Sequence, residues 1–168
     1  MQNIEIKTVV RDAGELARRV EAMEAPLVWA HLQKDTFFRV PRGYLKLRQV
    51  EGEPAELIAY LRESGSEPRA SDYDIAVVED GESLLRALTR SLGLRGVVEK
   101  RRRLHRWRHT RIHLDAVRGL GDFLELETVV DGITTDEARQ EADEAIARLD
   151  LDRADFLDRP YLELLEAR

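Results

Sequence analysis

The stretch from Val97 to Val130 constrains the fold more than any other part of the chain, because its polar residues recur at every second position. The charged and polar residues of this parity are Lys100, Arg102, Arg111, His113, Asp115, Glu125 and Glu127. Apolar residues hold the opposite parity, among them Ile112, Leu114, Leu124 and Leu126. Because residues i and i+2 share a face of a β-strand, the pattern predicts neighbouring strands that direct charge to one side.

The remaining sequence predicts further strands, joined mostly by short turns such as that at Pro41-Arg42-Gly43. Before the long basic strand we expect strands at residues 3–10, 33–40, 44–50, 56–63 and 73–78. Helices are expected from Asp12, over residues 82–92, and from Thr134 or Thr135 to Leu149, with short helical pieces over 153–167. Short turns imply antiparallel pairing.

These elements favour an α+β fold, in which an eight-stranded antiparallel sheet closes into a β-barrel with helices packed outside. The 168 residues contain no repeat and no convincing linker, so we expect a single domain over residues 1–168. A closed barrel would turn the charged face inward, whereas an open sheet would leave it in solvent.

Composition excludes several classes of protein. The net charge of −6 argues against a general nucleic-acid binder. There is no cysteine, which removes disulfides, thiolate nucleophiles and zinc–thiolate sites. No apolar run is long enough to span a membrane and no signal peptide is recognisable. We therefore expect a cytoplasmic protein without a membrane partner, present as a monomer or homodimer.

Charges of matching parity make one net-positive face in a net-negative chain. Its cations are Lys7, Lys46, Arg48, Arg62, Lys100, Arg102 and Arg111, and its acids are Glu5, Asp115, Glu125 and Glu127. Crowded cations in a partly dry site need a counter-ligand, and phosphate groups suit arginine and lysine. Glu5, Glu125 and Glu127 offer oxygen ligands through which Mg²⁺ or Mn²⁺ could bridge to phosphate.

Alternating charge also has a plainer explanation, a solvated face with cross-strand ion pairs. That explanation suits any single pair, such as Lys46 and Arg48, but weakens when the same parity recurs on several strands. Four other arginines of the basic stretch are expected to be solvated: Arg101 and Arg103, which have the opposite parity to Lys100 and Arg102, and also Arg106 and Arg108.

An ordered set of short segments resembles the CYTH superfamily, the triphosphate tunnel metalloenzymes. The first, Asn3-Ile4-Glu5-Ile6-Lys7, is similar to that family's Glu-x-Glu-x-Lys with Asn3 in place of the first glutamate. The others are Asp35-Thr36-Phe37-Phe38, Pro41 to Arg48, Lys100-x-Arg102, Arg111-x-His113-x-Asp115, Glu125-Leu126-Glu127 and Pro160 to Leu165.

This resemblance implies a tunnel that binds a triphosphate with divalent metal. By similarity, the phosphates would be held by Lys7, Lys46, Arg48, Arg62, Lys100, Arg102 and Arg111. The metal ligands would be Glu5, Glu125 and Glu127, with Asp115 assisting or orienting a cation. Asn3 lowers the local negative charge by one, which would weaken a second metal site or alter the choice of metal.

The resulting expectation is a metal-dependent triphosphatase acting on tripolyphosphate, ATP or thiamine triphosphate. Glu5 and Lys7 would belong to the catalytic group, and His113 is a candidate general base because its ordinary pKa lies near neutrality. A structural role for His113 fits equally well. Two alternatives stay open: a class IV adenylate cyclase, and a non-catalytic sensor of polyphosphate or nucleotide.

Overall fold

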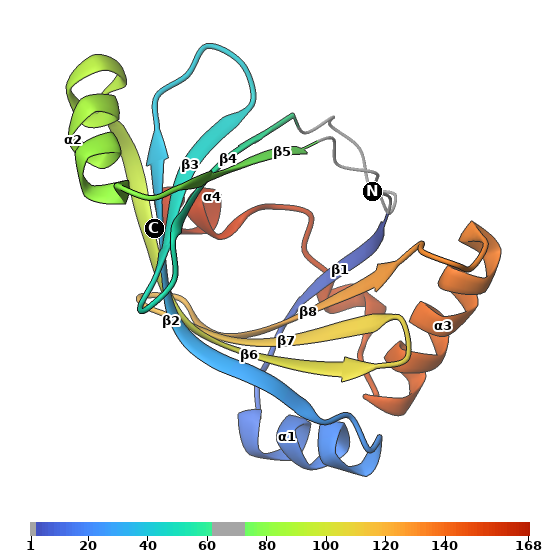
Figure 1. Cartoon of the computed structure of the whole chain (residues 1–168). Coiled ribbons are helices and arrows are strands. Elements are labelled where there is room, and N and C mark those ends of the chain that lie inside the picture. Colours follow the sequence, from blue (N-terminus) through green and yellow to red (C-terminus); the bar gives the residue numbers. More distant parts are fainter. Residues whose placement is uncertain (1–2, 62–72) are drawn as a thin grey trace.

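The computed structural model describes residues 3–61 and 73–168, and these form one continuous antiparallel sheet with helices around it (Figure 1). The strands of the described residues are β1 (Asn3–Val9), β2 (Leu27–Phe38), β3 (Tyr44–Val50), β4 (Ala55–Tyr60), β5 (Tyr73–Val78), β6 (Leu94–Trp107), β7 (Thr110–Val117) and β8 (Gly121–Val129). Their spatial order is β1-β8-β7-β6-β2-β3-β4-β5.

The helices of the described residues are α1 (Ala13–Ala22), α2 (Gly81–Leu92), α3 (Thr135–Arg148) and α4 (Tyr161–Glu166), with a 3₁₀ turn at Arg153–Asp155. Asp12 caps α1 by accepting from the backbone N–H of Glu15, and Thr134 forms a capping box with Glu137 at α3. Both N-termini were expected from the sequence. None of the described helices is both long and apolar enough to cross a membrane.

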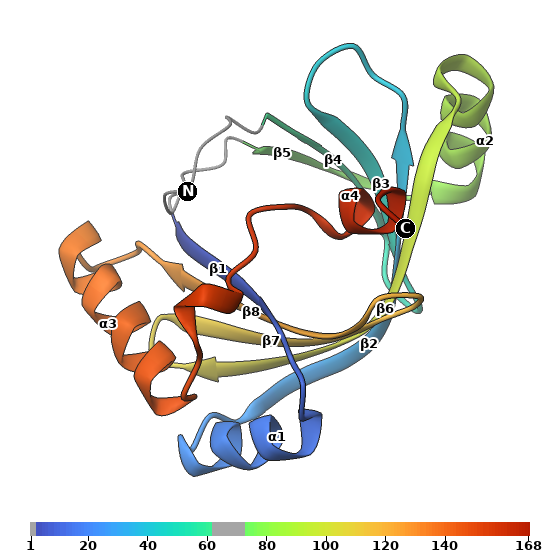
Figure 2. The same cartoon turned by 180° about the vertical axis from the view of Figure 1, so that it is seen from behind.

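The sheet curves strongly, with α1, α2 and α3 on its convex side and α4 inside the curve (Figures 1 and 2). The convex face carries the apolar parity predicted from the sequence. Leu114, Leu124 and Leu126 pack with α1 and α3, and Phe38 and Leu47 pack under α2. Burial of these side chains fixes the register of each strand, because a one-residue slip would turn them into the concave side.

The prediction of a closed barrel is not confirmed, since no register joins the edge strands β1 and β5 within the described residues. One edge of β1 is partly occupied by the C-terminal segment instead. The backbone N–H of Leu157 donates to the Lys7 carbonyl at 2.8 Å, and Thr8 forms a bridge with Phe156. The sheet is therefore a curved, hydrogen-bonded layer with two edges in this part of the chain.

The predicted boundaries of two strands were also wrong. The second strand begins at Leu27 rather than at residue 33, because it pairs along nearly all of the long β6 strand. The fourth begins at Ala55, and its pairing with β3 ends at Tyr60. Residues 62 and 63 of the predicted strand, including Arg62, lie outside the described residues.

Candidate functional site: a concave face of paired charges

The concave face brings together the predicted cations of the described residues. They arrive from four strands: Lys7 from β1, Lys46 and Arg48 from β3, Lys100 and Arg102 from β6, and Arg111 from β7. Lys7, Lys100 and Arg102 are buried, at 7%, 6% and 8% exposure. Each is paired with carboxylates on neighbouring strands, and the pairs fall into three clusters.

The Asp35 cluster joins β2 to β3 and consists of Gln33, Asp35, Lys46 and Arg48. Asp35 is 3% exposed and receives Lys46 Nζ on Oδ2 at 2.9 Å. Arg48 donates to both oxygens of Asp35, from Nε at 2.9 Å and from Nη2 at 3.1 Å. Burial would raise the pKa of Asp35, but the charges of Lys46 and Arg48 outweigh it and hold the pKa far below its ordinary value.

The Asp115 cluster joins β6, β7 and β8 to β1 and consists of Lys7, Lys100, Arg102, Asp115, Glu125 and Tyr161. Arg102 donates to Asp115 Oδ1 at 2.7 Å and Oδ2 at 2.5 Å, and Lys100 Nζ lies 3.2 Å from Oδ2. Arg102 also donates to Glu125, whose other oxygen pairs with Lys7 at 3.1 Å. Burial, reinforced by the Arg102 charge, lowers the pKa of Lys100 to about 8.

The Glu127 cluster lies at the β7–β8 side and consists of Asn3, Arg111, His113 and Glu127. Asn3 Nδ2 donates to Glu127 Oε1 at 2.6 Å, and Arg111 Nη1 donates to Oε2 at 3.2 Å. His113 Nε2 lies 3.5 Å from the same Oε2. Burial alone would raise the pKa of Glu127, but His113, Asn3 and Arg111 together lower it to about 2.

Burial lowers the pKa of His113, which is 7% exposed, so its imidazole is neutral near pH 7. Its Nδ1 is a buried polar atom without a hydrogen-bond partner in the described part of the chain. A neutral imidazole that contacts Glu127 has the protonation state that a general base requires. The catalytic assignment of His113 stays a prediction.

The predicted metal ligands suit a divalent cation in chemical kind. Glu5 and Glu127 are cross-strand partners on β1 and β8, and Glu125 lies two residues before Glu127 on the same face. Such carboxylate oxygens are typical Mg²⁺ ligands. Within residues 3–61 and 73–168, however, no three His, Asp or Glu side chains are gathered as a metal site. Glu125 and Glu127 pair with cations of the protein, Asp115 is shared by Lys100 and Arg102, and the assignment of these acids as metal ligands stays a prediction.

Two residues that complete these clusters were not predicted. Asp35 was recognised only as part of a resemblance, although Gln33, Asp35 and Phe37 alternate on β2 and place it on the face of Lys46 and Arg48. Tyr161 also lies in a segment of that resemblance, Pro160 to Leu165, but no alternation of residues there indicated that it would join the charged face. It begins a six-residue helix, and its hydroxyl reaches Asp115 across 46 positions of sequence, at 3.0 Å.

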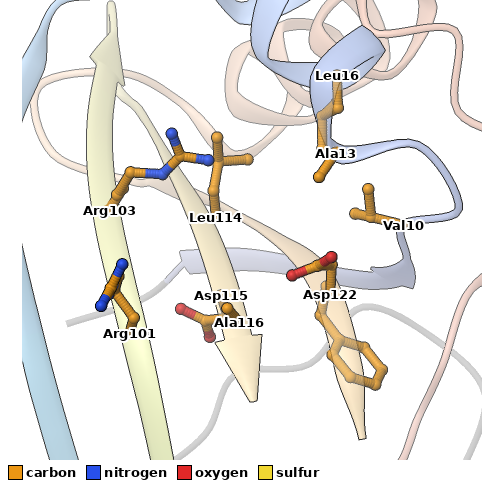
Figure 3. A pocket seen from close by; sticks show the side chains of 10 residues that line it. Val10, Ala13, Leu16, Arg101, Arg103, Leu114, Asp115, Ala116 and Asp122 are labelled. Carbon is orange, nitrogen blue, oxygen red and sulfur yellow. The ribbon is translucent and has the colours of Figure 1, made fainter. Parts of the chain in front are cut away.

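A separate pocket of about 240 Å³ lies on the convex side, between the start of α1 and the sheet (Figure 3). Its lining includes Leu16 of α1, Leu114 of β7, and Arg101 and Arg103 of β6. These arginines have the parity predicted to face away from the charged site. Arg101, Arg106 and Arg108 are exposed, as expected, whereas Arg103 is half-buried where it lines this pocket.

Comparison with known proteins gives a consistent result. A protein of Methanocaldococcus jannaschii named "Putative adenylate cyclase" is 23% identical over 174 residues, with 98% of each chain covered. The solved PH1012 protein of Pyrococcus horikoshii superposes with a TM-score of 0.86 at 23% identity, covering 96% of this chain and 98% of that one. A Hippeastrum protein described as a "putative adenylyl cyclase" with a dominant triphosphatase activity superposes at 0.71 with 16% identity, covering 99% and 96%.

The model of the CYTH domain matches residues 1–161, which includes every strand described above and the start of α4. The matched residues thus include all the strands that carry the charged clusters of the concave face. The chain belongs to the CYTH domain family.

Proposed function

We propose that this chain is a divalent-metal-dependent phosphohydrolase that binds an inorganic or organic triphosphate at its concave face. The observation that carries the proposal is the gathering of buried cations, each paired with a carboxylate, on one face of the sheet. Lys7, Lys100 and Arg102 are held by Asp115 and Glu125 at hydrogen-bond distance. Lysine and arginine each carry several N–H donors, so these cations can bind phosphate oxygens while the carboxylates hold them in position.

In this proposal the residues divide by charge. Lys7, Lys46, Arg48, Lys100, Arg102 and Arg111 bind and orient the phosphate chain, and Arg62 is proposed to join them. The carboxylates of Glu5, Glu125 and Glu127 hold Mg²⁺ or Mn²⁺, with Asp115 orienting Lys100 and Arg102. When bound, the metal supplies charge stabilisation and an activated nucleophilic water.

The protein's own contribution to the reaction is mainly positioning and electrostatic stabilisation. Arginines approach the phosphate chain from β3 and β6, so developing negative charge meets fixed donors. Neutral His113, next to Glu127, is the group proposed to accept a proton during attack of water. Burial of the site limits competing solvent, which strengthens each of these interactions.

Adenylate cyclisation is the second candidate, favoured by the name of the M. jannaschii relative. The structure adds an aromatic surface on which a base could stack. Tyr44 and Tyr60 are parallel on the concave face, with ring centroids 4.8 Å apart and an interplanar angle of 9°. We rank hydrolysis first, and the triphosphatase activity described for the Hippeastrum protein supports that order.

The test is a product assay of the purified chain with tripolyphosphate, ATP and thiamine triphosphate, each with Mg²⁺ and with Mn²⁺. We expect orthophosphate release that stops when a chelator is added. Cyclic AMP and pyrophosphate as the only products from ATP would replace hydrolysis by cyclisation. Binding of triphosphate without turnover under any of these conditions would instead identify a sensor.

A further inference from the structure

The C-terminal segment, which contains the 3₁₀ turn Arg153–Asp155 and α4, forms part of the concave face. It runs along β1, where Thr8 Oγ1 donates to the Asp155 carbonyl at 3.2 Å, and then turns inside the curve of the sheet (Figure 2). There Tyr161 and Leu162 are buried among apolar residues of β2, β6, β7 and β8. The segment thus has a fixed position next to the Asp115 cluster.

Tyr161 contacts three charged members of that cluster. Its hydroxyl donates to Asp115 Oδ2 at 3.0 Å. The face of its ring lies 4.4 Å from Lys7 Nζ and 5.0 Å from Lys100 Nζ. Phe123 packs against the ring edge-to-face at 4.9 Å, which holds the ring in place. Two ammonium groups from different strands therefore contact one aromatic ring.

These contacts favour phosphate binding for two reasons. The hydroxyl shares the negative charge of Asp115, so that carboxylate holds Lys100 and Arg102 less tightly than it otherwise would. Cation–π contact fixes the two buried ammonium groups at the positions from which they can donate to phosphate. Burial and the charges of Glu125 and Asp115 raise the pKa of Tyr161, which keeps the hydroxyl a donor throughout the working pH range.

We propose that Tyr161 is a positioning residue for the triphosphate site, holding Lys7, Lys100 and Asp115 in the arrangement that receives phosphate. This inference rests on the proposed function, because it assigns part of the binding energy for the same substrate. The C-terminal segment then determines how tightly phosphate binds, although it lies far in sequence from the strands that supply the cations.

The experiment compares Tyr161→Phe, Tyr161→Leu and the unaltered chain by calorimetric titration with tripolyphosphate in chelator, so that no turnover is needed. Tyr161→Phe keeps the ring and should weaken binding about threefold, whereas Tyr161→Leu also removes the cation–π contacts and should weaken it about tenfold. Glu166→Gln is the matched control. This change removes the ion pair between Glu166 of α4 and Arg95 but alters no contact of the Asp115 cluster. The affinity for tripolyphosphate should therefore stay within twofold of that of the unaltered chain.

Steady-state kinetics separates positioning from loss of structure. A positioning role raises KM and leaves kcat within about twofold, whereas partial unfolding lowers kcat through the active fraction and leaves KM unchanged. Thermal melting identifies a Tyr161→Leu protein that does not fold, in which case Tyr161→Phe decides. Unchanged affinity in the folded Tyr161 variants, with normal binding by the unaltered chain, would overturn this inference alone. Failure of the unaltered chain to bind tripolyphosphate, ATP or thiamine triphosphate, with Mg²⁺ as well as in chelator, would overturn the proposed function and this inference together.

Discussion

The Asp35 and Asp115 clusters use the same local arrangement in two parts of one sheet. In each, a Lys-x-Arg pair lies on one strand, and the aspartate lies directly across from the arginine on the next. Arg48 is the cross-strand partner of Asp35, and Arg102 is the partner of Asp115. Cross-strand pairing explains why both aspartates are bound by a guanidinium and an ammonium group.

The two clusters differ in what covers them. The side chains of Lys46 and Arg48 remain 13% and 23% exposed, whereas those of Lys100 and Arg102 are only 4% and 10% exposed. Tyr161 and Glu125 complete the Asp115 cluster, whereas among the described residues Gln33 is the one further donor to Asp35. The same charges are therefore more strongly desolvated on the side where the C-terminal segment enters.

The largest difference is expected in stability. Asp115→Asn should lower the free energy of unfolding by about 3–5 kcal/mol, because it leaves Lys100 and Arg102 buried without their main counter-charge. Asp35→Asn should cost about 1–3 kcal/mol, since Lys46 and Arg48 can reach water. Urea denaturation at pH 7 measures both. Equal decreases in the free energy of unfolding for the two variants would show that the different burial of the two clusters does not affect stability.

The Glu127 cluster provides a reference outside both aspartate clusters. Glu127→Ala should lower metal-dependent turnover by about 100-fold and change stability far less, because Glu127 is proposed as a metal ligand. The measurement is orthophosphate release across a Mg²⁺ titration. Glu99→Ala is the control, since Glu99 pairs with Arg118 at the surface. Activity unchanged by Glu127→Ala across the titration would remove Glu127 from the metal ligands.

Arginine-to-lysine changes compare the two clusters as phosphate sites without changing net charge. Arg102→Lys should weaken tripolyphosphate binding by about 30-fold, and Arg48→Lys by about fivefold, because the more desolvated guanidinium makes the stronger forked hydrogen bonds. Calorimetric titration in chelator gives both constants. A larger effect at Arg48 would assign the main phosphate contact to the Asp35 cluster.

The smallest expected effect is a pH dependence that belongs to the Asp115 cluster. The pKa of Lys100 lies near 8, and phosphate binds the protonated form. Affinity for tripolyphosphate should therefore fall as pH rises above 8, by at most about tenfold per pH unit for one proton. Lys100→Arg keeps the charge at high pH and should flatten the profile relative to the unaltered chain. Parallel profiles for the two proteins would assign the loss to another group.

Period-two alternation in the sequence was enough to sort most side chains between the two faces. Burial of Leu114 and Leu124 on one side and of Lys100 and Asp115 on the other follows from it, because strand geometry allows no intermediate position. Helix caps at Asp12 and Thr134 were equally predictable from local chemistry. The sequence also indicated that Asn3 replaces a family carboxylate, and the structure places that amide as a donor to Glu127.

Local pattern determined which residues share a face, but only tertiary structure decided which of them touch. The acids were predicted as metal ligands from their type alone, and only the fold shows that Glu125 and Asp115 both pair with Arg102. Tyr161 bonds to Asp115 although the two residues are far apart in the sequence. Likewise, β1 pairs with the C-terminal segment at Thr8 and Phe156 rather than with β5. The physical reason is range: alternation follows from the geometry of consecutive residues, while ion pairing and sheet closure depend on the relative positions of several strands, which no local pattern encodes.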